Sequence, residues 1–139
     1  MEQTTIKLVQ DSFEKVKPIA ATAAEIFYTK LFELDPNLKA LFPGDPTDPS
    51  MKEQGNKLMT MLGAAVAGLS NLEALIPVLQ DLGKRHVGYK VEASHYDTVG
   101  AALLDTLKVG LGEGFTPEVK DAWASVYTTM AKVMIDASY

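Results

Sequence analysis

The chain carries only two histidines, His86 and His95, and no cysteine, so few of its side chains could bind a metal cofactor. Without cysteine, disulfides, iron–sulfur clusters, covalent CxxCH haem attachment and thiolate catalysis are all excluded. A structural zinc site needs four ligands and is therefore not expected. An iron porphyrin needs only one or two axial protein ligands. It is the metal cofactor that two histidines can hold.

His86 has the sequence context of a ligand. Leu79 and Leu82 precede it by seven and four residues, which places the three side chains on one face of a helix. An imidazole at the end of such an apolar stripe can bind a cofactor in an apolar pocket, although a histidine at this place can also be purely structural. We expect His95 to be structural or exposed.

Two further patterns suggest a functional site, but each lacks residues that such a site needs. Glu92 and His95 form a Glu-x-x-His pair, but a di-iron bundle needs a second pair and two more glutamates, and Gly83 lies three residues before His86. The segment 110–114 (GLGEG) follows a helical pattern instead of a strand, so it is predicted to be a helix end and turn. No metalloprotease, nucleophile-elbow or P-loop motif occurs, and no catalytic residue is predicted.

Helical patterns that would position these residues run through nearly the whole chain. Apolar residues recur every three or four positions, and proline or glycine marks the joints. We expect an all-α fold of six main helices plus two short ones, with one short helix from the Asp35–Pro36 cap to about Phe42. Pro77 is predicted to begin or restart a helix, and the next helix is predicted to begin at about Glu92. Thr116 is predicted to cap the last helix.

Length and composition set the remaining limits. The 139 residues predict a single domain over 1–139, and 47% hydrophobic residues fit a globular core. A net charge of −5 argues against nucleic-acid binding. The longest apolar stretch, 62–69, is too short for a membrane span, and no signal-peptide pattern is visible. We therefore expect a cytoplasmic protein.

Several segments, in this order, resemble bacterial single-domain globins related to the haem domain of flavohaemoglobins. The likeness covers about residues 3–136 and is carried by FYTKLFELDPNLKALF (27–42), KLM (57–59), NLE-LIP-LQDLG (71–83), LGKRH (82–86), SHYDTVGAALL (94–104) and DAWASVY (121–127). The resemblance implies a globin fold around a haem pocket. It also implies a non-covalently bound haem b (iron protoporphyrin IX).

The resemblance further implies a role for each of eight residues at that pocket. His86 matches the proximal iron ligand. Tyr28 and Gln54 match distal residues, whose hydroxyl and amide could both donate hydrogen bonds to a polarised dioxygen ligand. The other implied cofactor-binding residues are Leu58 above the iron, Phe42 against the porphyrin, Tyr96 beside the histidine, Leu82 and Val91.

The function that this resemblance implies is reversible binding of dioxygen, carbon monoxide and nitric oxide, for oxygen storage or transport. The alternative is a nitric oxide dioxygenase for nitric oxide detoxification. Because the sequence stops at Tyr139 with no flavin domain, an external flavin reductase would have to supply its electrons. Ser138 stands where flavohaemoglobins carry a proximal glutamate, which favours gas binding over catalysis. A haem-based sensor and a haem-free helical interaction module are two further alternatives.

Overall fold

The computed structural model describes residues 2–41, 49–88 and 92–138, and within these ranges the chain is helical and has no strand. Its α-helices are α1 (Gln3–Val16), α2 (Ala20–Leu34), α3 (Pro49–Gly68), α4 (Leu72–Gly88), α5 (His95–Leu111) and α6 (Pro117–Ser138). Short 3-10 helices are η1 (Lys17–Ile19), η2 (Pro36–Leu41), η3 (Leu69–Asn71) and η4 (Gly112–Gly114). The all-α prediction with six main helices is confirmed. Over the described ranges, four short helices stand where two were expected.

The predicted helix ends at three joints are confirmed. The Asp35 carboxylate accepts a hydrogen bond from the backbone N–H of Asn37 (3.1 Å), at the start of η2. The Thr116 hydroxyl accepts one from the N–H of Val119 (3.2 Å), in the first turn of α6. Gly112 ends α5 with a φ of +54°, in the region that favours glycine.

Two predicted helix starts are wrong. Pro77 lies inside α4, which already begins at Leu72. Because η3 and the first turn of α4 establish the helix before Pro77, the helix tolerates the loss of one backbone hydrogen bond. In addition, α5 begins at His95 rather than at about Glu92. The backbone N–H of His95 donates to the Glu92 carbonyl (3.0 Å), and this forms a turn before the helix.

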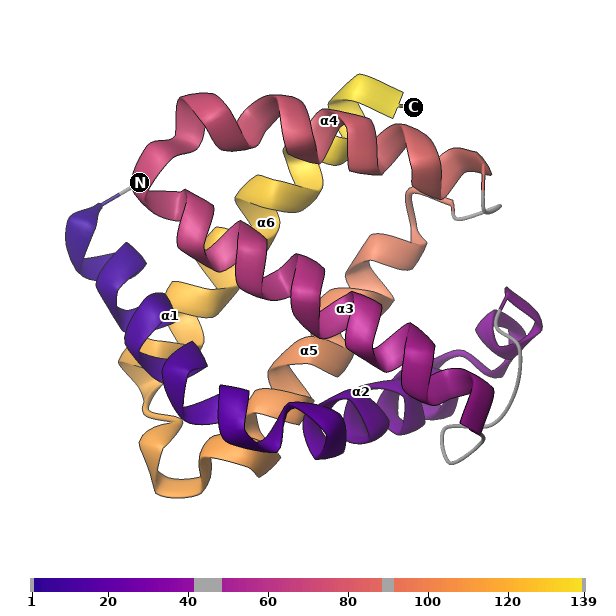
Figure 1. Cartoon of the computed structure of the whole chain (residues 1–139), viewed down its shortest axis with the longest axis horizontal. Helices are drawn as coiled ribbons and strands as arrows, with labels where there is room; N and C mark the ends of the chain where they lie inside the picture. Colours follow the sequence, from indigo (N-terminus) through magenta and orange to yellow (C-terminus); the bar gives the residue numbers. More distant parts are fainter. Residues whose placement is uncertain (1, 42–48, 89–91, 139) are drawn as a thin grey trace.

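Two sets of helix contacts build the core. Helix α6 packs against α1 and α4, and α2 packs against α5 and α3. Figure 1 shows α5 and α6 behind α3, while α3 and α4 join at η3 and diverge from there. At the centre, the fully buried indole of Trp123 donates a hydrogen bond to the Ser12 hydroxyl (2.8 Å). This bond joins α6 to α1.

We expect Ser12→Ala to lower the free energy of unfolding by about 1–3 kcal/mol, because the Trp123 N–H would lose its partner in a buried place. Urea denaturation followed by tryptophan fluorescence measures this loss. Ser125→Ala, at an exposed position of α6, serves as the matched control. Equal stabilities for the two variants would contradict the role assigned to the Ser12 hydroxyl.

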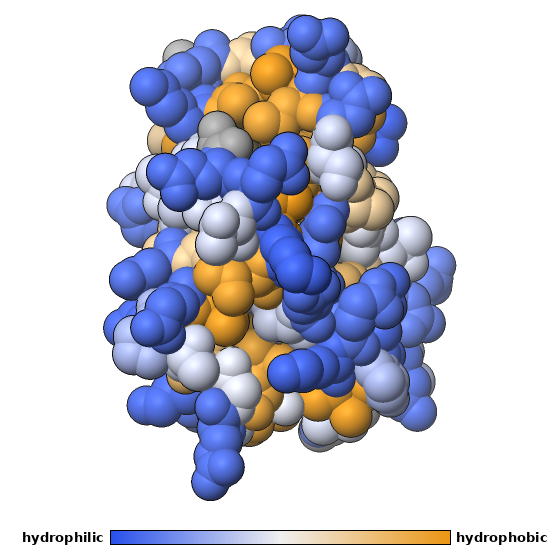
Figure 2. Space-filling view, turned by 90° about the vertical axis from the view of Figure 1, so that its left-hand side faces the viewer, coloured by the Kyte–Doolittle hydropathy of each residue, from blue (hydrophilic) through white to orange (hydrophobic). Residues whose placement is uncertain are grey.

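Within the part of the chain that the structure describes, one stretch, Met51–Val87, is long and apolar enough to cross a membrane by length and composition alone. The prediction from consecutive apolar residues missed it, because polar residues such as Ser70 and Asn71 interrupt it. It is weak evidence for a span, since the stretch turns at η3 and runs back as α4 (Figure 1). The face drawn in Figure 2 also mixes apolar patches with strongly polar side chains. Only 22% of the most apolar 18-residue window within Met51–Val87 is buried inside the protein.

Candidate functional site

The His86 side chain lies half-buried near the end of α4, and its ring is held in one orientation. Its Nδ1 lies 2.7 Å from the backbone carbonyl oxygen of Leu82, four residues earlier in the same helix. A carbonyl can only accept, so Nδ1 must carry the hydrogen. In the neutral ring the lone pair is then on Nε2, which is the form that binds a metal ion.

Tyr96, in the first turn of α5, lies beside His86. The two ring centroids are 6.2 Å apart, and the ring planes are inclined at 47°. The Tyr127 hydroxyl of α6 donates to the Tyr96 carbonyl (2.7 Å) and so fixes the backbone there. Burial raises the pKa of Tyr127, and nearby Tyr96 and Asp97 raise it further, so this donor stays protonated at neutral pH.

On α2 and α3 the structure brings together two of the predicted distal residues. The Gln54 side-chain amide donates a hydrogen bond to the Tyr28 hydroxyl oxygen (3.3 Å). Tyr28 is 3% exposed, and its ring packs edge-on against Phe27. Burial raises the pKa of Tyr28, while the hydrogen bond from Gln54 lowers it by a smaller amount. The hydroxyl is therefore neutral near pH 7 and keeps its hydrogen, so it can act as a donor as well as an acceptor.

The third predicted distal residue, Leu58, follows Gln54 by one helical turn. Its side chain is half-buried and packs on the edge of the core, as does the Leu82 side chain. Gln54 and Leu58 belong to the first half of α3, and His86 to the last turns of α4. These are the ends at which the two helices diverge (Figure 1). Phe42 and Val91, the remaining predicted residues, lie outside the described residues.

The residues present fit a haem group. On the diverging helices, Leu58 and Met59 of α3 and Leu82 of α4 are only partly buried by the protein itself. Haem offers a large apolar surface to cover them. His86 presents an imidazole whose Nδ1–H donates to a carbonyl, which leaves Nε2 as the ligand atom.

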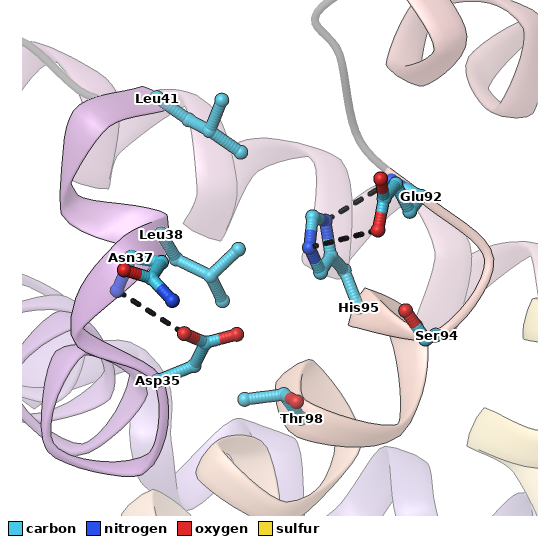
Figure 3. A pocket seen from close by; sticks show the side chains of 8 residues that line it. All are labelled: Asp35, Asn37, Leu38, Leu41, Glu92, Ser94, His95 and Thr98. Atoms are coloured by element: carbon cyan, nitrogen blue, oxygen red, sulfur yellow. Dashed lines mark hydrogen bonds and ion pairs between the residues drawn. The ribbon is translucent and has the colours of Figure 1, made fainter.

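Both ring nitrogens of the other histidine, His95, interact with its neighbour Glu92. Its Nδ1 accepts a hydrogen bond from the Glu92 backbone N–H (3.0 Å), and its Nε2 lies 3.8 Å from the Glu92 carboxylate. Figure 3 shows this pair at one side of a hollow of about 530 Å³, opposite Asp35, Leu38 and other residues of the η2 segment. Over the described ranges, no group of three or more histidine, aspartate or glutamate side chains could hold a metal ion.

Sequence reasoning missed the close approach of α6 to the helix that carries His86. A Cβ added to Gly83 would lie 2.5 Å from the backbone oxygen of Met134 and 2.7 Å from the Ser138 hydroxyl oxygen. Ser138 therefore packs directly on α4, one turn before His86. Its hydroxyl oxygen is buried and has no hydrogen-bond partner among the described residues. In the sequence, only the glycine at position 83 indicated this contact.

We expect Gly83→Ala to push α4 away from α6 and to lower the free energy of unfolding by about 1–3 kcal/mol. Urea denaturation measures the loss. Gly114→Ala is the control, since an added Cβ there would meet its nearest neighbours at 3.8 Å. If Gly83→Ala proved as stable as the control, the assigned contact between α4 and α6 would be wrong.

Comparison with known proteins gives a consistent picture. A family model described as globin matches residues 25–134, which is more than half of the chain. Neuroglobin-1 of Oncorhynchus mykiss is 32% identical over 146 aligned residues, covering 96% of this chain and 92% of that protein. Neuroglobin of Danio rerio is 32% identical over 136 aligned residues, which cover 91% of this chain and 86% of that protein. A flavohemoprotein of Bacillus subtilis (strain 168) is 28% identical over 135, covering 97% of this chain and 33% of that longer protein.

Proposed function

The chain belongs to the globin family, and we propose that it binds haem b non-covalently through His86 and serves to bind dioxygen, carbon monoxide and nitric oxide reversibly. When bound, haem supplies the ferrous iron that holds the gas. The protein's own residues hold the cofactor, exclude water and donate hydrogen bonds to the ligand. The flavohemoprotein similarity is compatible with the bacterial origin expected from the sequence.

On the His86 side, the residues hold one tautomer and one ring orientation. The Leu82 carbonyl accepts the Nδ1 hydrogen, so Nε2 carries the lone pair. The Tyr96 ring limits rotation of the imidazole from one side. The contact between Nδ1 and the Leu82 carbonyl is the single observation that carries the proposal, because it places the lone pair on Nε2, the atom from which the ring would bind the metal.

On the other side, Tyr28 on α2 and Gln54 on α3 provide two polar donors that lie next to each other. The Tyr28 hydroxyl is buried and neutral, and it already takes part in a hydrogen bond with the Gln54 amide. A ligand with partial negative charge can accept from these groups without the cost of ordering them anew. Apolar Leu58, one turn after Gln54 on α3, lies on the same face of the helix and is partly buried against the core.

Titration of the protein with haem, followed by visible absorbance, tests the proposal. We expect saturation at one haem per chain and a ferrous form that changes its spectrum on addition of carbon monoxide. His95→Ala should saturate at the same ratio, since Glu92 occupies that ring. A protein that takes up no haem would contradict the proposed function.

A nitric oxide dioxygenase is the second candidate, and the similarity to a flavohemoprotein favours it. In that function, nitric oxide, dioxygen and one electron from a reductant would give nitrate, and haem would supply the iron chemistry. Ser138 in the contact with Gly83 argues for slow turnover, because it places no carboxylate near His86. Without a carboxylate acceptor, the imidazole gains less negative character.

Nitrate production under nitric oxide distinguishes the two functions. We expect about one nitrate per haem from the protein with NADH, and only slow turnover when a flavin reductase is added. Fast and sustained turnover with the reductase would make the dioxygenase the better description. It would also show that the Ser138 position needs no carboxylate.

A further inference from the structure

The bend between α3 and α4 is closely packed. Gly68 ends α3, and a Cβ added to it would lie 3.0 Å from the side chain of Leu75, in the first turn of α4. Leu69, the first residue of η3, is fully buried. The chain therefore turns around a buried leucine, and position 68 has little room for a side chain.

A side chain of α1 binds both sides of this bend. The Gln10 amide nitrogen donates a hydrogen bond to the Val66 carbonyl in the last turn of α3 (3.1 Å) and another to the Ser70 hydroxyl in η3 (3.0 Å). Both distances are in the usual range for N–H···O bonds. The last carbonyls of a helix have no partner within the helix, so Gln10 supplies a donor to one of them.

Gln10 is itself held in place by the core. Its neighbour Val9 is fully buried, and so is Phe13, one turn later on α1. The Phe13 ring meets α3 at Gly63, where an added Cβ would lie 3.4 Å from it. Helix α1 also packs against α6. The half-buried Gln10 amide therefore connects the bend to a part of the fold that is fixed independently of the bend.

The angle at the bend determines how far apart the far ends of α3 and α4 lie, since the two helices diverge from η3 (Figure 1). His86 follows Leu72 by fourteen residues, which corresponds to about 21 Å along α4. A rotation of α4 by about 5° at the bend would move His86 by about 2 Å, whereas a metal–ligand distance tolerates only about 0.2 Å. A small change at the bend is therefore large at the haem site.

We propose that Gln10 is a positioning residue for the haem site. By binding to both sides of the bend it fixes the angle between α3 and α4, and with it the separation of His86 from Gln54. The inference rests on the proposed function, because it needs haem between these two residues. Loss of the amide should widen the range of separations and weaken haem binding, and this effect is distinct from a loss of stability.

The distance between two spin labels, measured by pulsed electron paramagnetic resonance on the haem-loaded protein, tests the separation. Because the chain has no cysteine, Asn56→Cys on α3 and Lys84→Cys on α4 would carry the only labels, and both positions are exposed. We expect one narrow distance distribution with Gln10 and a broad one with Gln10→Leu. Gln10→Lys should restore the narrow distribution, because the ammonium group can donate to both oxygens.

Haem retention gives a second measurement. We expect Gln10→Leu to lose haem to an excess of a haem-free globin about tenfold faster, the lower end of the cost when a group that orients a metal ligand is lost. Ser12→Ala is the matched control, because it removes a bond from α1 to α6 that does not reach the bend. Although we expect it to lower stability, it should keep the narrow distribution and the original rate of haem loss.

The outcomes separate this inference from the proposed function. If Gln10→Leu kept the narrow distribution, or lost haem no faster than the unaltered protein, the role of Gln10 would be wrong while the proposed function stood. If Ser12→Ala gave the same broadening as Gln10→Leu, both would act through stability alone, and the role would again be wrong. If the unaltered protein took up no haem, the proposed function itself would fail.

Discussion

His86→Ala should lower the affinity for haem by more than about 100-fold, because loss of a group that merely orients a ligand already costs ~10–100-fold. The structure gives His86 the Nδ1–H bond to Leu82 that prepares Nε2 for a metal, and it gives His95 no such role. Haem titration followed by absorbance measures the change. The ferrous spectrum of any haem retained should also be altered.

Added imidazole provides the sharpest control for this variant. Imidazole can enter the space that the side chain vacates, so it should restore a large part of the ferrous spectrum. His95→Ala should bind haem like the unaltered protein. If His86→Ala kept an unchanged spectrum and normal haem retention, the ligand assignment would be wrong.

Tyr28→Phe and Gln54→Leu should each speed dioxygen release about tenfold, since one hydrogen bond lost in a dry pocket is worth roughly 1–2 kcal/mol. Stopped-flow displacement of dioxygen by carbon monoxide gives the rates. Carbon monoxide is less polar when bound, so its release should change much less. Unchanged dioxygen rates in both variants would place these side chains outside the pocket.

The pH dependence of dioxygen release provides a further check on Tyr28. Burial raises the pKa of Tyr28 above its ordinary value of 10.0, so the hydroxyl remains protonated and able to donate over the neutral range. The release rate should therefore be constant from about pH 6 to about pH 9. Faster release within that range that disappears in Tyr28→Phe would show that the hydroxyl ionises, contrary to this account.

Local features of the chain could be predicted from sequence because they depend on neighbouring residues. The cap at Asp35, the cap at Thr116 and the turn at Gly112 each follow from one residue type at a helix end. The helical spacing that places Leu82 four residues before His86 likewise leads directly to the Nδ1–carbonyl bond. The predicted helix start at Pro77 was wrong, because the turn before Pro77 had already established the helix.

Contacts between distant segments could not be predicted in this way. The packing of Ser138 on Gly83 and the hydrogen bond from Gln54 to Tyr28 join residues far apart in the chain. The resemblance to known globins placed Tyr28 and Gln54 at the distal side of one pocket, whereas periodicity alone could not. The packing of α2 against α3 likewise depends on the angle and distance at which two helices cross. No local pattern encodes these.

Reversible oxygenation of the haem-loaded ferrous protein tests the central proposal most directly. Absorbance spectra would be recorded under argon, after addition of dioxygen and after renewed flushing with argon, with carbon monoxide added last. We predict a distinct spectrum under dioxygen, full return of the original ferrous spectrum after flushing, and a carbonyl spectrum at one ligand per haem. Immediate conversion to the ferric form, or a ferrous spectrum that neither gas changes, would contradict a reversible gas-binding function.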